Sequence, residues 1–171
     1  MWRLLQQIHK VGLASEPMPA PDESTLQRQL QEQIHRVFGR ALAIREVDAG
    51  SCNGCELEIH ALNNPYYNLE GAGIRFVASP RHADALLVTG PVSRHMAQAL
   101  QRTYDATPEP KLVIAVGDCG ACGGVFGQSY ASLGGVANVI PVDVVVPGCP
   151  PTPTALLQGI LAAIGKRATN P

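Results

Sequence analysis

Residues 112–124, LVIAVGDCGACGG, place a short apolar run directly before a turn of glycines and cysteines. LVIAV (112–116) has the length and the branched apolar side chains of a buried strand. Four similar runs are each bounded by Gly, Pro, Asp or Ser: ALAIREV (41–47), IRFVA (74–78), ALLVT (85–89) and DVVV (143–146). The sequence therefore predicts five buried strands.

Helical segments are predicted between these strands, at Glu56–Asn63, Val92–Tyr104 and Thr154–Gly165. Strands that alternate with helices indicate a parallel sheet with helices on both faces, the doubly wound α/β class. We assign residues 41–165 to this domain and residues 166–171 to a tail. Residues 1–40 are assigned to an N-terminal helical extension.

The extension contains two predicted helices and a proline-rich linker, SEPMPAPDES (15–24). Residues 1–14 form the first helix, whose apolar stripe and basic side chains suit a membrane surface or a groove on a partner. Packing back onto the domain is the alternative. The second helix has apolar residues at steps of three and four up to Phe38, with Ser24 or Thr25 as its cap.

Composition limits the classes of function. The 171 residues suffice for one domain with a core, at 46% hydrophobic and 16% charged residues. A net charge of −1 predicts no nucleic-acid partner. We find no export signal, and the apolar run Ala155–Ile164 is about half of the ~20 residues that span a bilayer, so a cytoplasmic protein is expected.

Five cysteines in such a chain argue against disulfides, because the cytoplasm keeps thiols reduced. Cys52, Cys119 and Cys149 each follow a predicted strand. In an open parallel sheet the carboxyl ends of the strands share one edge, where ligands bind. We therefore expect these three cysteines to converge.

Glycine or proline flanks each of these thiols, in AGSCNGCELE (49–58), VGDCGACGGVFG (116–127) and VPGCPPTP (146–153). Such residues allow tight turns whose backbone N–H groups can point at sulfur, and Gly54 supplies this freedom between Cys52 and Cys55. Pro150 follows Cys149 directly, and ferredoxins also place a proline directly after a cluster cysteine. The pattern favours an iron–sulfur cluster.

Three other interpretations of the thiols fit the pattern less well. Two Cys-x-x-Cys pairs suit zinc, but 63 residues separate them, against roughly 15–20 in a compact zinc ribbon. A thioredoxin-like redox pair at Cys52 and Cys55 leaves Cys149 without a role. Free cysteines are most often simply buried in the core, but such cysteines seldom lie in Gly/Pro turns.

Four motifs occur in the order of one known family: SCNGCELE, ASPRHADALLVTGPVS, AVGDCGACGG and VPGCPPTP, within residues 44–162. The chain thus resembles the small, cluster-carrying subunit shared by NiFe hydrogenases and respiratory complex I. The resemblance implies a flavodoxin-like fold, one 4Fe-4S cluster and docking onto a large catalytic subunit.

The resemblance also implies the ligands. The family's G-x-C-x-x-x-G-G corresponds to residues 117–124 and its P-G-C-P-P to residues 147–151. The implied ligand set is Cys52, Cys55, Cys119 and Cys149. Cys122 is then a spare thiol beside the cluster, with substitution for Cys119 as the alternative.

Asn53 and Gly54 separate the first two cysteines, as in hydrogenase small subunits, whereas complex I subunits carry them as neighbours. The chain looks most like the small subunit of membrane-bound, energy-converting NiFe hydrogenases, the group that includes formate hydrogenlyase. The alternatives are a complex I-like quinone-reducing module and a zinc-binding flavodoxin-like interaction module.

In the hydrogenase interpretation this chain is an electron-transfer subunit with no catalytic residue of its own. The implied partners are a large NiFe-hydrogenase-like subunit, similar to the complex I 49 kDa subunit, and a ferredoxin-like iron–sulfur subunit. Membrane subunits are indirect partners. The expected location is the inner face of the cell membrane, as a peripheral part of a complex.

Three further residues are candidates for the surroundings of the cluster: Gly54, Glu58 and Arg81. Glu58 matches a glutamate of the complex I branch near cluster and partner. Hydrogen bonding of the loop is the favoured role of this carboxylate, and proton relay is the alternative. Arg81, with His82 and Asp84, matches a family segment close to the partner. Contact with the large subunit and a solvated arginine are the two interpretations of Arg81. Glu56 is predicted to complement the dipole of the helix that begins there.

Overall fold

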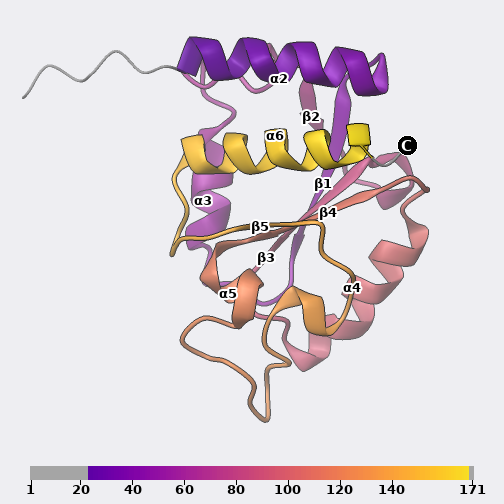
Figure 1. The fold of residues 1–171 in the computed structure, drawn as a ribbon. Coiled ribbons are helices and arrows are strands. Elements are labelled where there is room, and N and C mark those ends of the chain that lie inside the picture. The colour runs from indigo at the N-terminus through magenta and orange to yellow at the C-terminus, as the bar shows by residue number, and fades with distance from the viewer. Residues whose placement is uncertain (1–22, 170–171) are drawn as a thin grey trace, which may run out of the picture.

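The five predicted strands form one sheet in the computed structural model, which describes residues 23–169 (Figure 1). All pairs are parallel, in the order β2-β1-β3-β4-β5. This is the flavodoxin-like order, so the predicted fold class is confirmed. The strands are β1 (Leu42–Asp48), β2 (Ile74–Phe76), β3 (Ala85–Thr89), β4 (Leu112–Val116) and β5 (Val144–Val146).

Within residues 23–169 the sheet is accompanied by five α-helices and two short 3-10 turns. The four expected helices within the described range are present, with ends that differ by a few residues from the prediction. A further short helix follows β4, where the glycines predicted only a turn. The helices are α2 (Glu23–Phe38), α3 (Gly54–Ala61), α4 (Arg94–Ala106), α5 (Gly117–Cys122) and α6 (Pro153–Thr169); the 3-10 turns are η1 (Pro80–His82) and η2 (Val136–Asn138).

The sheet has a separate apolar core on each face. On one face Leu87 and Ile114 pack with α2, α3 and α6. On the other face Leu86 and Val113 pack with α4 and η2. Figure 1 shows α2 and α6 lying side by side over the first face, and α4 on the opposite side of the sheet. Each buried side chain of this kind stabilises the fold by roughly 1.5–3 kcal/mol, which explains the unbroken apolar runs of β3 and β4.

The N-terminal extension is described from Glu23 onward. The predicted first helix and most of the linker lie outside the described residues. Helix α2 begins at Glu23, so Ser24 and Thr25 fall within its first turn rather than at its cap. Its Leu30 and Ile34 are buried in the same core as the sheet.

Helix α6 extends beyond the expected end of the domain. It runs to Thr169, so residues 166–169 of the expected tail are helical. Between Glu23 and Thr169, the structure contains no helix with the length and apolar character that crossing a membrane requires.

Candidate iron–sulfur site

The cysteines gather at the carboxyl edge of the sheet. Cys52 lies in the loop after β1, Cys119 in α5 directly after β4, and Cys149 in the loop after β5. Cys55 is the second residue of α3 and is buried, whereas Cys52 and Cys149 are exposed. The parallel topology therefore brings together residues that are far apart in the chain, as expected.

Four of the thiols lie close enough to affect one another's ionisation. Burial raises the pKa of the Cys55 thiol to about 12, and charges on Glu56, Cys119, Cys52 and Cys149 act in the same direction. Burial also raises the pKa of Cys119, with Cys149 and Cys52 as the next causes. The geometry agrees with this grouping. A Cβ on Gly54 would lie 3.5 Å from Cys52 Sγ and 4.0 Å from Cβ of Pro150, which follows Cys149. A Cβ on Gly117 would lie 2.8 Å from Cys55 Sγ and 3.2 Å from the carbonyl oxygen of Gly148, which precedes Cys149.

The loop that carries Cys52 is held by short-range hydrogen bonds. The Asp48 carboxylate accepts from the backbone N–H groups of Gly50 and Ser51, both at 2.7 Å. The Ser51 hydroxyl accepts from the Asn53 N–H at 3.1 Å. Asn53 adopts the left-handed conformation with φ 71°, which asparagine tolerates better than most residues. The chain can thereby turn from the strand into α3 with two cysteines on the turn.

Bare glycine backbone lies against two of the sulfur atoms. A Cβ atom on Gly117 would lie 2.8 Å from Cys55 Sγ, and one on Gly124 would lie 2.7 Å from Cys119 Sγ. Both glycines have positive φ, at +77° and +54°, a region that other residues rarely adopt. Four cysteine sulfurs with closely approaching backbone are the donor set of a 4Fe-4S cluster, so the residues present fit such a group.

Asp118 joins two of the cysteine-bearing loops. Its carboxylate Oδ1 accepts from the Gly148 N–H at 2.9 Å. Its own N–H donates to the Gly148 carbonyl, also at 2.9 Å. These two bonds tie the residue before Cys119 to the residue before Cys149, and so set the spacing of the two loops.

Cys122 differs from the other four cysteines. It is exposed, as Cys52 and Cys149 are, but its Sγ donates to the Asp118 carbonyl at 3.3 Å, one turn back along α5. The Cys122 thiol is therefore engaged with its own helix.

The spacing of the thiols also bears on the kind of metal centre. Within residues 23–169, no three His, Cys, Asp or Glu side chains converge closely enough to hold a single metal ion. In a 4Fe-4S cluster each thiolate binds a different iron, so the ligands of a cluster do not have to meet at one point.

Glu56 is buried, which the sequence interpretation did not predict. It lies in the first turn of α3, as predicted, but it is only 8% exposed. Neither carboxylate oxygen has a hydrogen-bond partner within the described part of the chain. Its helical spacing from the apolar Ile59 is the sequence signal for this burial. Glu58, the glutamate that the sequence placed near the cluster, is half-buried.

The other two candidates for the cluster's surroundings lie at opposite edges of the sheet. A Cβ on Gly54 would be 3.5 Å from Cys52 Sγ, which places Gly54 against the thiols. Arg81 lies in η1, before β3, in a pocket with residues that precede β1 and β4. Residues that precede a parallel strand lie at the edge opposite those that follow it, so the structure does not bring Arg81 to the thiols.

Large apolar side chains are exposed on the segments that carry the cysteines. Leu57, two residues after Cys55, is 63% exposed, and Phe126, two residues after Gly124, is also 63% exposed. Val125 and Tyr130 in the same loop as Phe126 are almost fully exposed. Single exposed apolar residues are common, but several near one site indicate a surface that contacts another protein.

Comparison with known families matches residues 52–163 to the NADH ubiquinone oxidoreductase 20 kDa subunit family. Among curated proteins, a probable membrane-bound hydrogenase subunit of Pyrococcus furiosus is 46% identical, covering 80% of this chain and 81% of that protein. Formate hydrogenlyase subunit 7 of Escherichia coli is 42% identical over 87% of this chain and 58% of its own length.

A relative from the quinone-reducing branch is equally similar. An NADH-quinone oxidoreductase subunit of Desulfovibrio desulfuricans is 48% identical, over 72% of this chain and 67% of that protein. Among solved structures, a chain of an archaeal membrane-bound sulfane sulfur reductase superposes with a TM-score of 0.68 at 32% identity. The superposition covers 82% of this chain and 77% of that one.

Proposed function

Because the chain belongs to the family of the NADH ubiquinone oxidoreductase 20 kDa subunit, we propose that it carries one 4Fe-4S cluster on Cys52, Cys55, Cys119 and Cys149. The chain is a subunit of an oxidoreductase complex, as its relatives are. The observation that supports the ligand set best is the convergence of the segments that carry these four thiols, which follow the ends of three strands.

A bound 4Fe-4S cluster supplies one-electron transfer. The residues of this chain hold the cluster and adjust its surroundings. Cys55 is buried, which keeps water from that corner of the site, and its thiol would bind iron as the thiolate. Glycine backbone against Cys55 and Cys119 allows amide groups to approach sulfur, which tunes the reduction potential. No residue of the chain is assigned a catalytic role.

The proposed role is electron relay between the active site of a large subunit and the clusters of a ferredoxin-like subunit. The exposed apolar side chains of Leu57 and Phe126 support a docking face next to the thiols, on which the large subunit would lie. A protein cover there also lowers the dielectric constant around the cluster. Peripheral attachment to the inner face of the cell membrane, through other subunits, completes the proposal.

We assign the partner to the NiFe-hydrogenase type rather than the quinone-reducing type. The feature that favours this assignment is Asn53-Gly54 between the first two cysteines, which matches the hydrogenase pattern. The alternative is a complex I-like quinone-reducing module. The similarity to the NADH-quinone oxidoreductase subunit of Desulfovibrio desulfuricans supports this alternative.

Metal analysis tests the cluster. After anaerobic purification of the full chain within its complex, we expect about four iron and four sulfide per copy of this chain, in addition to those of the other subunits. The same analysis of a complex with Cys149→Ser shows how much iron and sulfide belongs to this cluster, because this variant should lose this cluster and keep those of the other subunits. Zinc without sulfide at the site would refute the proposal and favour the zinc-binding interaction module.

Activity of the same complex distinguishes the two redox functions. A hydrogenase partner should evolve hydrogen from a reduced artificial donor, and the reaction should stop in the Cys149→Ser complex. Reduction of a quinone analogue without hydrogen evolution would instead establish the complex I-like alternative. Two Cys-x-x-Cys nickel motifs in the large partner's sequence provide an independent check.

A further inference from the structure

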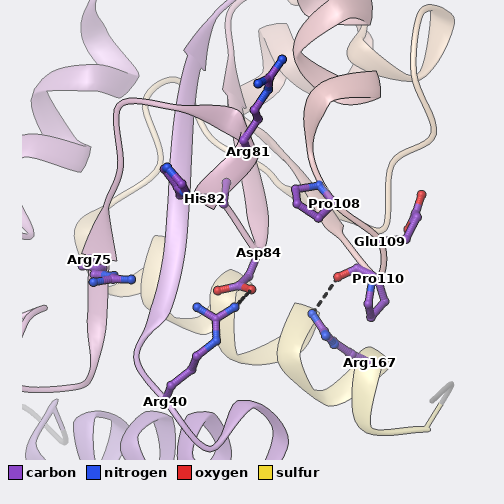
Figure 2. Close-up of a pocket in the computed structure, with 10 residues that line it drawn as sticks. Arg40, Arg75, Arg81, His82, Asp84, Pro108, Glu109, Pro110 and Arg167 are labelled. Atoms are coloured by element: carbon purple, nitrogen blue, oxygen red, sulfur yellow. Dashed lines mark hydrogen bonds and ion pairs between the residues drawn. The ribbon is translucent and has the colours of Figure 1, made fainter.

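A pocket of about 320 Å³ opens at the amino edge of the sheet, opposite the thiols (Figure 2). This volume is at the lower end of the range of small-molecule sites. The charged groups in its lining come from separate elements: Arg40 precedes β1, Arg75 lies in β2, Arg81 and His82 lie in η1, Asp84 precedes β3, and Arg167 lies in the last turn of α6.

The lining is positively charged. The lining contains four arginines and two carboxylates, those of Asp84 and Glu109, which leaves a net charge of +2 with His82 neutral. The whole chain has a net charge of −1. The pocket lining is therefore positively charged although the whole chain has a net negative charge. A positively charged hollow attracts anions.

The two carboxylates of the pocket are already engaged. Asp84 is buried; one carboxylate oxygen accepts from Arg40 at 2.6 Å and the other from the Ala43 N–H at 3.0 Å. Glu109 forms an ion pair at 3.1 Å with Lys111, which lies outside the pocket lining. Asp84 therefore offsets the charge of Arg40, and the other three arginines of the pocket have no carboxylate of the lining as a partner.

Arg167 is held in position while most of its donors stay available. Its Nη1 donates to the Pro110 carbonyl at 3.0 Å, and its guanidinium lies over the Phe38 ring at 4.3 Å. Figure 2 shows this arginine and the Arg40–Asp84 pair at neighbouring walls of the pocket. A guanidinium presents five N–H donors, so this one binds an anion without losing its support.

Arg75 and Arg81 complete the set of donors. Both are exposed, and within residues 23–169 neither has a hydrogen-bond or ion-pair partner. In Figure 2, Arg75 and His82 lie to one side of the Arg40–Asp84 pair, and Arg81 extends away from it. The pocket thus has unpaired cationic side chains around its mouth and a fixed arginine at its wall.

We propose that this pocket binds a phosphate monoester, either a soluble one or the head group of a phospholipid such as phosphatidic acid. The planar guanidinium matches phosphate with two parallel hydrogen bonds, and several guanidinium groups around one hollow suit an ion with three acceptor oxygens and more than one negative charge. A single side-chain carboxylate of a protein partner carries one charge and two acceptors, so it satisfies fewer of these donors.

Binding to the full chain, loaded with its cluster, tests the proposal. Inorganic pyrophosphate titrated by calorimetry should bind saturably, and Arg75→Gln or Arg167→Gln should each weaken binding about tenfold, through loss of a charge-assisted hydrogen bond. Arg102→Gln is the matched control, because this exposed α4 arginine is outside the pocket lining and the substitution removes the same charge. It should bind like the unaltered chain.

The source of the phosphate is distinguished by a second arm with vesicles. Retention on phosphatidylcholine vesicles only when they contain phosphatidic acid, with loss in Arg75→Gln, identifies a lipid head group. Pyrophosphate binding without retention on these vesicles identifies a soluble ligand. Equal weakening by Arg102→Gln, no saturable binding in either arm, or binding of an acidic peptide alone would overturn the proposal. The cluster content of each variant checks that it is folded.

Discussion

Cys119 and Cys122 lie one turn apart on α5, yet their thiols have different surroundings. Cys119 is partly buried against Gly124, whereas Cys122 is exposed and donates to the Asp118 carbonyl. We predict that Cys122→Ser keeps its full iron and sulfide content, because a serine hydroxyl can donate to the same carbonyl. Cys119→Ser should lose most of the cluster.

Iron and sulfide analysis, together with the electron paramagnetic resonance spectrum of the reduced protein, compares the two variants. Loss of the cluster in Cys122→Ser with retention in Cys119→Ser would contradict the ligand assignment. The result is independent of which partner the subunit serves.

Glu46 on β1 provides a prediction about pH. Burial raises the pKa of its carboxyl, and the charges on Glu56 and Asp48 act in the same direction against His60 and Arg45. The folded state therefore binds this proton more tightly than the unfolded state. Its contribution to stability is present at low pH and is lost as the pH rises through the raised pKa. Glu46→Gln, which stays neutral, should be more stable than the unaltered chain at neutral pH.

Urea unfolding at neutral and at mildly acidic pH measures this effect, and the gain should vanish in acid. Glu109 is the matched control, because its hydrogen bond from Lys111 lowers the pKa of its carboxyl. Glu109→Gln should lose stability at neutral pH, with the difference disappearing as the pH falls. Equal behaviour of the two variants would refute this account.

At the scale of elements, Asp118 connects the α5 segment to the loop before Cys149. Asp118→Ala removes the carboxylate that accepts from the Gly148 N–H. We expect a loss of about 1 kcal/mol in the free energy of unfolding, and a shifted reduction potential because the spacing of two ligands relaxes.

Asp118→Asn tests whether the hydrogen bond rather than the charge matters, because its amide oxygen can accept from the same N–H. It should restore both stability and potential. Asp105→Ala on α4 is the control for a generic exposed aspartate, since its partner is Gln101 on the same helix. A potential that is unchanged in Asp118→Ala would show that the two loops are spaced by other contacts.

Helix α6 contains two glycines with opposite surroundings. A Cβ on Gly159 would overlap the side chain of Val146 in β5, whereas a Cβ on Gly165 would meet nothing within 4 Å. Gly159→Ala should therefore cost about 1–3 kcal/mol of stability through overpacking. Gly165→Ala should add about 0.5–1 kcal/mol, because alanine favours a helix.

Urea unfolding of the two variants gives both numbers within one helix. Val146 lies three residues before Cys149, so Gly159→Ala should also reduce cluster content. A stabilising effect of Gly159→Ala would mean that the α6–β5 contact is looser than the structure indicates.

At the scale of the whole molecule, the sheet separates two surfaces of different chemistry. The carboxyl edge carries the thiols and exposed apolar side chains, and the amino edge carries the arginine pocket. Phe126→Ser should therefore reduce copurification of the large subunit several-fold while the cluster stays bound, because buried aromatic side chains contribute much of the affinity of an interface.

Tyr66→Ser is the control, because Tyr66 is also an exposed aromatic residue but follows the far end of α3. It should leave copurification unchanged. Equal loss in both variants, or loss of the cluster in Phe126→Ser, would argue against a docking face at the thiol edge.

The sequence alone determined the five strands, the parallel α/β class and the family resemblance. The strands were recognisable because β3 and β4 are buried on both faces and so consist of unbroken apolar runs. Cysteines placed directly after strands predicted the edge where they meet, since parallel topology sends all strand ends to one side. Helix α5 was missed because its glycines and cysteines carry no helical periodicity.

Only the tertiary structure decided which side chains are neighbours. The pocket at the amino edge combines groups from β2, η1 and α6 that share no sequence pattern, and it places Arg81 away from the thiols. Burial of Glu56 and the link from Asp118 to Gly148 likewise depend on packing between segments distant in the chain. Periodicity reports which face of an element is apolar, whereas long-range contacts arise only when the sheet assembles.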